Sequence, residues 1–154
     1  MNRAVIRALR VVLVLLALGA VAAQVLIVVV PVTQFSRPPD ALNWSYMSVG
    51  VVALLCVEAG LLALWVLLSR VARGSIFDHE ADRWVWVITA AGFLAALLVA
   101  GLCVHAGELS DAPGMVLVGF AFATAGVGFA LLMTVMLGLL RTATGLRTEL
   151  EQVV

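Results

Sequence analysis

The sequence contains no lysine, only two cysteines and little charge of either sign. Its nine basic residues are all arginine, they balance nine acidic residues, and they form no polybasic tail. Nucleic acid is therefore not expected as a direct partner, because proteins that bind it concentrate cationic side chains on one face or tail. The sequence also has no nucleophile beside a base, no glycine-rich phosphate loop and no metal-ligand spacing. We expect neither enzymatic activity nor a bound metal or cofactor.

Apolar residues are what the sequence has in abundance. They make up 64% of its 154 residues, and the mean hydropathy is +1.18. One small soluble core cannot bury so much apolar surface. Four apolar segments are long enough to cross a bilayer, which needs about 20 residues at ~1.5 Å of rise each. We place the spans near residues 11–30, 46–68, 84–104 and 112–140, all within one transmembrane domain that covers residues 1–154.

The first span resembles a signal peptide, because arginines precede it and Ala20-Val21-Ala22 looks like a cleavage site. Its apolar run continues to Pro31, however, and so exceeds an ordinary signal core. We therefore expect an uncleaved span.

Arginine placement predicts the orientation of the spans. Eight arginines lie in the N-terminal segment, in loop 69–83 and in tail 141–154, whereas the other two loops share only Arg37. By the positive-inside rule, both termini and loop 69–83 are cytoplasmic. The sequence thus predicts an all-α, multi-pass four-helix bundle in a bacterial cytoplasmic (inner) membrane, with a helical C-terminal extension.

The predicted cytoplasmic face has two organised features. In loop 69–83, Asp78 is suited to cap a helix that runs through "HEADRWVW" into the third span. This loop is interpreted either as a solvated helix start or as a docking site. In the tail, apolar residues recur at spacings of four and three, which forms an apolar seam on an otherwise polar helix. The seam consists of Leu139, Ala143, Leu146, Leu150 and Val153.

Such a seam is expected to be covered by the N-terminal helix of the same chain, by its central loop or by a soluble cytoplasmic protein. The candidate docking residues are Arg73, Ile76, Phe77, Arg83, Trp84, Leu146, Arg147 and Leu150.

Four segments of the sequence resemble a known family. They read "CVEAGLLALW", "RGSIF", "RWV" and "FALLMTVMLGLLRTATGLRTELEQVV". Together they look like the actinobacterial branch of DUF2975, a family of small membrane proteins with four spans, and the C-terminal segment is the most specific. Trp86 stands where an Asp is common in the family, which argues against carboxylate chemistry there. The family has no assigned activity. Its members often resemble partners of small helix-turn-helix regulators encoded beside them, so the resemblance implies such a regulator by association.

Glu58 is the unusual residue inside the predicted membrane. A charge midway along a span costs at least ~2.5–3.5 kcal/mol, and no span contains an Arg or Lys to neutralise it. We therefore predict that Glu58 is protonated and donates a hydrogen bond to a neighbouring helix. The acceptors we expect are Thr124 and Thr134 on the fourth span and Gln24 on the first. This intramembrane polar site is either an interhelical clasp or a proton- or cation-responsive site.

The fourth span also contains small residues four apart, such as Gly119 with Ala123 and Gly126 with Ala130. This spacing allows helices to approach closely in lipid. The partner is either the second and third spans or a second copy of the chain, so a homo-oligomer stays open.

Two classes of function are consistent with the sequence. One is a membrane-embedded regulatory or scaffolding protein that holds a soluble partner, and the other is a small transporter or channel subunit built around Glu58. We favour the first, because the recognisable organisation outside the bilayer lies on one side.

Overall fold

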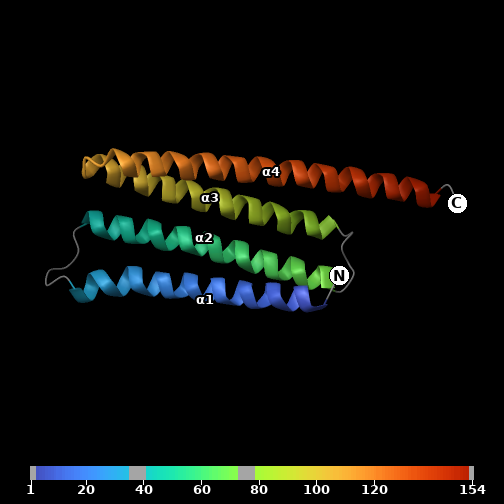
Figure 1. The fold of residues 1–154 in the computed structure, drawn as a ribbon, viewed down its shortest axis with the longest axis horizontal. Coiled ribbons are helices and arrows are strands. Elements are labelled where there is room, and N and C mark those ends of the chain that lie inside the picture. The colour runs from blue at the N-terminus through green and yellow to red at the C-terminus, as the bar shows by residue number, and fades with distance from the viewer. Residues whose placement is uncertain (1–2, 35–40, 73–78, 153–154) are drawn as a thin grey trace.

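The structure is a computed structural model that describes residues 3–34, 41–72 and 79–152. The side chains it describes are those of residues 6–30, 43–69, 83–139 and 142. The described residues form four helices (Figure 1), namely α1 (Arg3–Gln34), α2 (Ala41–Ala72), α3 (His79–Leu109) and α4 (Pro113–Gln152).

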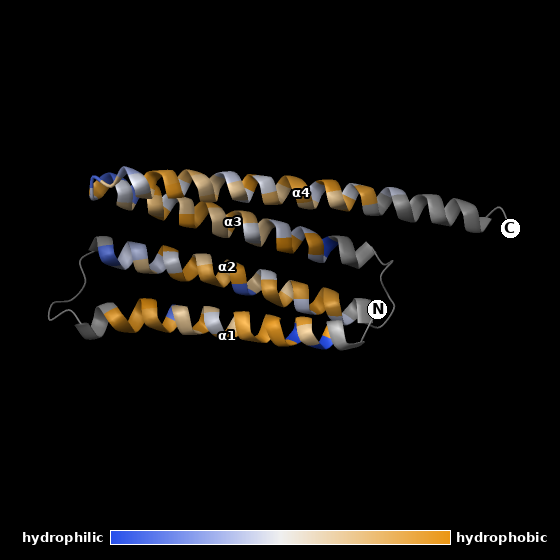
Figure 2. Ribbon diagram, in the orientation of Figure 1, coloured by the Kyte–Doolittle hydropathy of each residue, from blue (hydrophilic) through white to orange (hydrophobic). Residues whose placement is uncertain are grey.

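Each helix contains a segment long and apolar enough to cross a membrane. In Figure 2 the middle parts of the helices are mostly apolar, and hydrophilic residues gather towards their ends. The predicted all-α four-helix membrane fold is confirmed. The segments are Ile6–Val30, Asn43–Ser69, Arg83–Leu109 and Pro113–Leu139.

The helices extend into both ends of the predicted loop 69–83. Helix α2 continues to Ala72, and α3 begins at His79, where the sequence predicts a helix through "HEADRWVW". The physical reason is that a helix satisfies its own backbone hydrogen bonds and need not end where the apolar run ends. The first residue of α3 is the one expected after an N-cap at Asp78, but Asp78 itself lies outside the described residues.

Consecutive helices are antiparallel and lie side by side in chain order (Figure 1). Within the described parts, α1 contacts only α2, and α4 contacts only α3. The α3–α4 contact is the most extensive and the α1–α2 contact is the least extensive. The bundle is therefore open, since α1 and α4 do not meet. Helix α1 begins and α4 ends at the same end, which we name the inner end because the arginines predict that it faces the cytoplasm.

An open row of helices leaves little interior. The buried apolar side chains are mostly alanines, and most larger apolar side chains are exposed on the surface that lipid would cover. This exposure is expected in a membrane, because lipid tails are as apolar as leucine and burial against another helix brings no hydrophobic gain. The buried apolar side chains in the described parts are those of Leu13, Ala20, Met47, Ala53, Ala63, Leu68, Ala95 and Ala100.

Small residues set the close approach of α4 to α3. A Cβ atom added at Gly119 would lie 2.9 Å from the carbonyl oxygen of Ala100, and one added at Gly126 would lie 2.6 Å from the Cβ of Ala96. Both distances are too short for a real side chain, so these glycines are required by the packing. The predicted close approach is therefore present, and its partner is the third span of the same chain.

The turn between α3 and α4 is tight. The amide of Ala112 donates to the carbonyl of Gly107 at 2.9 Å, and Asp111 adopts a left-handed conformation with φ of 49°. A left-handed residue together with a hydrogen bond spanning six residues is the Schellman helix ending. This turn reverses the direction of the chain, so α4 packs antiparallel to α3 directly after it.

Helix α4 is the longest element. Its apolar segment ends at Leu139, yet the helix continues to Gln152 and projects past α1, α2 and α3 at the inner end (Figure 1). The predicted helical extension is thus present.

Candidate functional site

A groove with a volume of about 450 Å³ lies between α1 and α2. Its α2 wall has the spacing of a single helical face, three and four residues apart. Five of the lining side chains, including Leu18 and Leu62, are exposed, so the groove opens on the outer surface of the bundle where lipid would lie. The lining residues are Leu13, Val14, Ala17, Leu18 and Val21 from α1 and Glu58, Leu61, Leu62 and Trp65 from α2.

Glu58 lines this groove near the middle of the Asn43–Ser69 span. Its Oε1 atom is buried and has no hydrogen-bond partner. Apart from Glu58 and Trp65, the lining side chains are aliphatic. Trp65 follows Glu58 by two helical turns, which is about 10 Å along the axis. The groove therefore surrounds one carboxyl group with hydrocarbon.

A cation lies over the Trp65 ring, at the inner end of the groove. The Cζ atom of Arg10 lies 5.8 Å from the centre of the Trp65 ring, within the ~6 Å range of a cation–π interaction. The Nε atom of Arg10 is buried and has no hydrogen-bond partner. The sequence analysis did not predict this pair. Arg10 is near the start of the first span and Trp65 is near the end of the second, so the two residues lie at the same depth once these spans are antiparallel neighbours.

The structure separates the four residues predicted to form an intramembrane polar site. The hydroxyl of Thr124 donates to the carbonyl of Phe120, and that of Thr134 donates to the carbonyl of Ala130, each at 2.8 Å. Threonine in an apolar helix commonly bonds the carbonyl one turn before it. The expected pairing of Glu58 with the threonines is wrong, because α3 lies between α2 and α4.

Gln24 also lies apart from Glu58. Ile27 lies beside Gly50 and Arg10 lies beside Trp65, so in this antiparallel pair Gln24 is level with about residues 51–53. That is more than one helical turn from Glu58. The Nε2 atom of Gln24 is buried without a hydrogen-bond partner. Gln24 and Glu58 thus each have a buried polar atom without a hydrogen-bond partner, and they lie at different depths, too far apart to bond each other.

The predicted docking surface is only partly described. Arg83 is exposed and Trp84 is half-buried at the start of the third span. Arg73, Ile76 and Phe77 lie outside the described residues. The backbone of α4 includes Leu146, Arg147 and Leu150, whose side chains are likewise outside the described set. The docking surface therefore stays a prediction.

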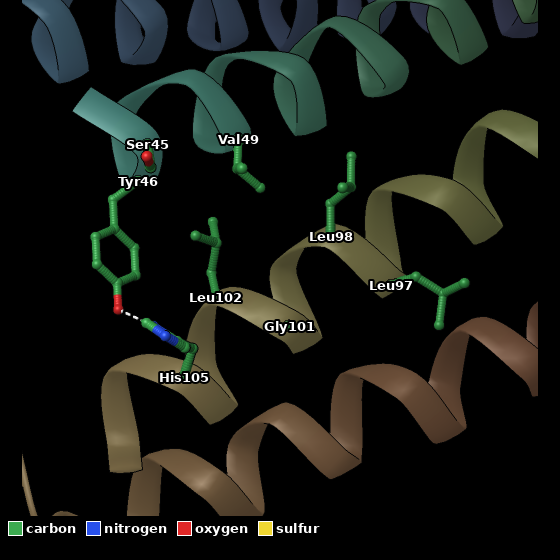
Figure 3. A pocket seen from close by; sticks show the side chains of 8 residues that line it. All are labelled: Ser45, Tyr46, Val49, Leu97, Leu98, Gly101, Leu102 and His105. Atoms are coloured by element: carbon green, nitrogen blue, oxygen red, sulfur yellow. Dashed lines mark hydrogen bonds between the residues drawn. The ribbon is translucent and has the colours of Figure 1, made fainter. Parts of the chain in front are cut away.

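A second, smaller pocket of about 280 Å³ lies between α2 and α3 at the opposite end of the bundle. Figure 3 shows Tyr46 of α2 and His105 of α3 pointing toward one another, and their hydroxyl and Nδ1 atoms form a hydrogen bond. The two ring centres are 5.6 Å apart. Sequence reasoning did not pair these residues, which are 59 positions apart. Among the described residues, no group of three His, Cys, Asp or Glu side chains is placed to hold a metal ion.

Comparison with known proteins gives one family. The family model described as "Protein of unknown function (DUF2975)" matches residues 34–154, which include α2, α3 and α4. The chain therefore belongs to the DUF2975 family. No curated protein and no solved structure matches it.

Proposed function

We propose that this DUF2975 protein is a membrane-embedded regulatory or scaffolding protein that holds a soluble cytoplasmic protein at the C-terminal part of α4. The supporting observation is the projection of α4 beyond the other helices, from Leu139 to Gln152 (Figure 1). At about 1.5 Å of rise per residue, this extension is roughly 20 Å long.

An isolated helix of that length is not stable in water by itself, since helices shorter than ~12–15 residues are marginal even in favourable sequences. Two leucines of the seam, Leu146 and Leu150, fall in the projecting segment. Burying each would contribute about 1.5–3 kcal/mol. Within the described parts α4 does not contact α1, so the N-terminal helix gives this segment no cover. A soluble protein that packs on the seam would stabilise the helix.

The partner we propose is a small helix-turn-helix regulator, by association with the family. In this proposal the chain has no catalytic step and lies in the bacterial cytoplasmic membrane with its inner end in the cytoplasm. Regulation would consist of holding the regulator at the membrane.

Purification from the native membrane after cross-linking tests this proposal. The wild-type chain should bring down one soluble regulator in a fixed ratio. The double variant Leu146→Ser/Leu150→Ser should insert normally but lose it, because the apolar spans are unchanged. A matched control is Thr148→Ser/Gln152→Ser, which changes the opposite face of the same helix. Equal recovery of the regulator with both double variants would reject the seam as its binding surface.

A second candidate function is a small transporter or channel subunit, and the Glu58 groove favours it. Glu58, whose buried Oε1 atom has no hydrogen-bond partner, lines a groove that opens toward lipid, and intramembrane carboxyl groups commonly mark ion or substrate paths. Proton and cation flux into vesicles that contain the purified protein tests this candidate. Flux through the wild type that Glu58→Gln abolishes would support it, and absence of flux through the wild type would reject it.

A further inference from the structure

We propose that the groove between α1 and α2 binds a free amphiphilic amine, with the protonated nitrogen at the Glu58 carboxylate and the hydrocarbon body along the groove toward Trp65. The inference deepens the second candidate function, because it names the class of ligand for the same site. It depends on the groove and does not require that the ligand is transported.

The Glu58 carboxyl group lacks a hydrogen-bond donor. Oε1 of Glu58 is a buried acceptor that receives no donor from the protein. An unsatisfied buried acceptor costs about 1–3 kcal/mol. The indole N–H of Trp65 is two turns away, and the remaining lining side chains are aliphatic. Oε1 is shielded from the groove surface, so a ligand reaches it only when the Glu58 side chain turns toward the groove, and that ligand must supply an N–H or O–H group of its own.

The charge of a carboxylate favours a cationic ligand. A hydrogen bond between an ammonium and a carboxylate is roughly twice as strong as one between neutral groups. Low-dielectric surroundings strengthen the attraction further. No cationic side chain lines the groove beside Glu58, so a ligand cation has no competitor there. An amine is therefore preferred over an alcohol of the same size.

The shape of the groove limits the size of the ligand. The groove continues from Glu58 to Trp65 between aliphatic walls, over about 10 Å. Its volume of about 450 Å³ is suited to a small organic molecule. Arg10 already occupies the face of the Trp65 ring at the inner end, so a second positive charge on the ligand would be repelled. The ligand class is thus an amine with one charge and a short hydrocarbon chain.

Depth excludes the ammonium of a lipid headgroup as the source. Glu58 lies near the middle of its span, and the hydrocarbon core extends about 15 Å to either side of its centre. Headgroups lie beyond that distance. A neutral free amine that partitions into the bilayer can reach the carboxyl group laterally through the open side of the groove. There it takes the proton of the protonated Glu58 that the sequence predicts, which forms the ammonium–carboxylate pair.

Binding of radiolabelled n-octylamine to the full chain in lipid nanodiscs tests the proposal. Nanodiscs of phosphatidylcholine and phosphatidylglycerol contain no primary ammonium that competes. We expect saturable binding of one octylamine per chain above the level in empty nanodiscs, weakened by about tenfold or more in Glu58→Gln. Octyltrimethylammonium, which has the charge without an N–H donor, should displace it weakly. Octanol and octanoate should not displace it at the same concentration.

Two further variants separate the site from general effects. Gln24→Leu removes another unpartnered buried polar group, which lies outside the groove, and should bind octylamine as the wild type does. Ala17→Leu fills the groove while Glu58 stays in place, and should lose binding. If circular dichroism shows that Glu58→Gln does not fold, the Ala17→Leu variant decides the test. Equal binding by wild type, Glu58→Gln and Ala17→Leu, or equal displacement by octanoate, would overturn the proposal.

A second copy of the chain is the competing occupant. The variant Leu62→Cys tests whether a second copy occupies the groove, because Leu62 is exposed there. The two native cysteines are removed by Cys56→Ser and Cys103→Ser. We expect maleimide labelling of this cysteine to be slowed by octylamine. A disulfide-linked dimer formed in high yield, regardless of octylamine, would assign the groove to a second copy and overturn the proposal. Saturable binding without flux would reject only the transporter candidate, whereas absence of saturable binding rejects the inference itself.

Discussion

The guanidinium carbon of Arg10 lies 5.8 Å from the centre of the Trp65 ring, which joins the inner ends of α1 and α2. Within the described parts, α1 contacts no helix except α2. Charged and aromatic side chains at the end of a span can extend toward the interface while their apolar stems cover the helix. This contact is therefore expected to hold the edge helix of the bundle in place.

A double-mutant cycle measures the Arg10–Trp65 contact. We expect Arg10→Met and Trp65→Leu to weaken the packing of α1 on α2, with a coupling free energy of about 0.5–2 kcal/mol. Energy transfer between labels on α1 and α2 during denaturation in SDS reports the separation of the helices. Fully additive effects would show that the two side chains are neighbours without a net interaction.

The α3–α4 interface should not accept side chains at its close contacts. Gly119→Ala would place a methyl group against the carbonyl oxygen of Ala100, and Gly126→Ala would place one against the Cβ of Ala96. We expect each to lower the free energy of unfolding by roughly 1–3 kcal/mol. Gly128→Ala is the control, because nothing lies within 4 Å of its added Cβ. It should leave stability unchanged or raise it by about 0.5–1 kcal/mol. If all three variants unfold alike, the interface is looser than the structure shows.

Replacing Glu58 should not destabilise the protein. The sequence predicts a hydrogen bond whose loss in Glu58→Leu would weaken helix packing. In the structure, however, Oε1 has no partner to lose. Removing an unsatisfied buried acceptor should stabilise the fold by about 1–3 kcal/mol, and Glu58→Gln should stay within about 0.5 kcal/mol of the wild type. Unfolding in lipid bicelles measures both. A loss of more than about 1 kcal/mol in Glu58→Leu would reveal a partner for the carboxyl group.

The left-handed turn residue gives a test outside the spans. Asp111 is exposed and has φ of 49°, a region that costs an L-residue roughly 1–2 kcal/mol. Asp111→Gly should preserve or raise the thermal unfolding temperature, whereas Asp111→Val should lower it, because a β-branched residue is poorly tolerated there. Equal temperatures for the two variants would mean that the turn relaxes to another conformation.

Reporter fusions test the orientation predicted from the arginines. A reporter that works only in the cytoplasm should be active after Val154, and one that works only outside should be active when inserted near Pro38. Activity of both reporters on one side would contradict the predicted orientation.

The sequence by itself determined the four spans and the close approach of α4. Span number follows from the length of each apolar run, because a bilayer requires about 20 apolar residues per crossing. The small residues of α4, such as Gly119 and Gly126, predict close packing because only small side chains let two helix backbones approach. The sequence also predicted the helical extension of α4, since the apolar residues of its seam recur every three and four positions.

The tertiary structure alone decided which helices are neighbours. Apolar helices gain nothing from one another over lipid, so their hydropathy does not specify a partner; steric fit and the connections do. For this reason the sequence assigned Thr124 and Thr134 to Glu58, although α3 separates them in space. For the same reason it missed Arg10 with Trp65 and Tyr46 with His105, pairs formed between antiparallel neighbours and visible only once their register is known.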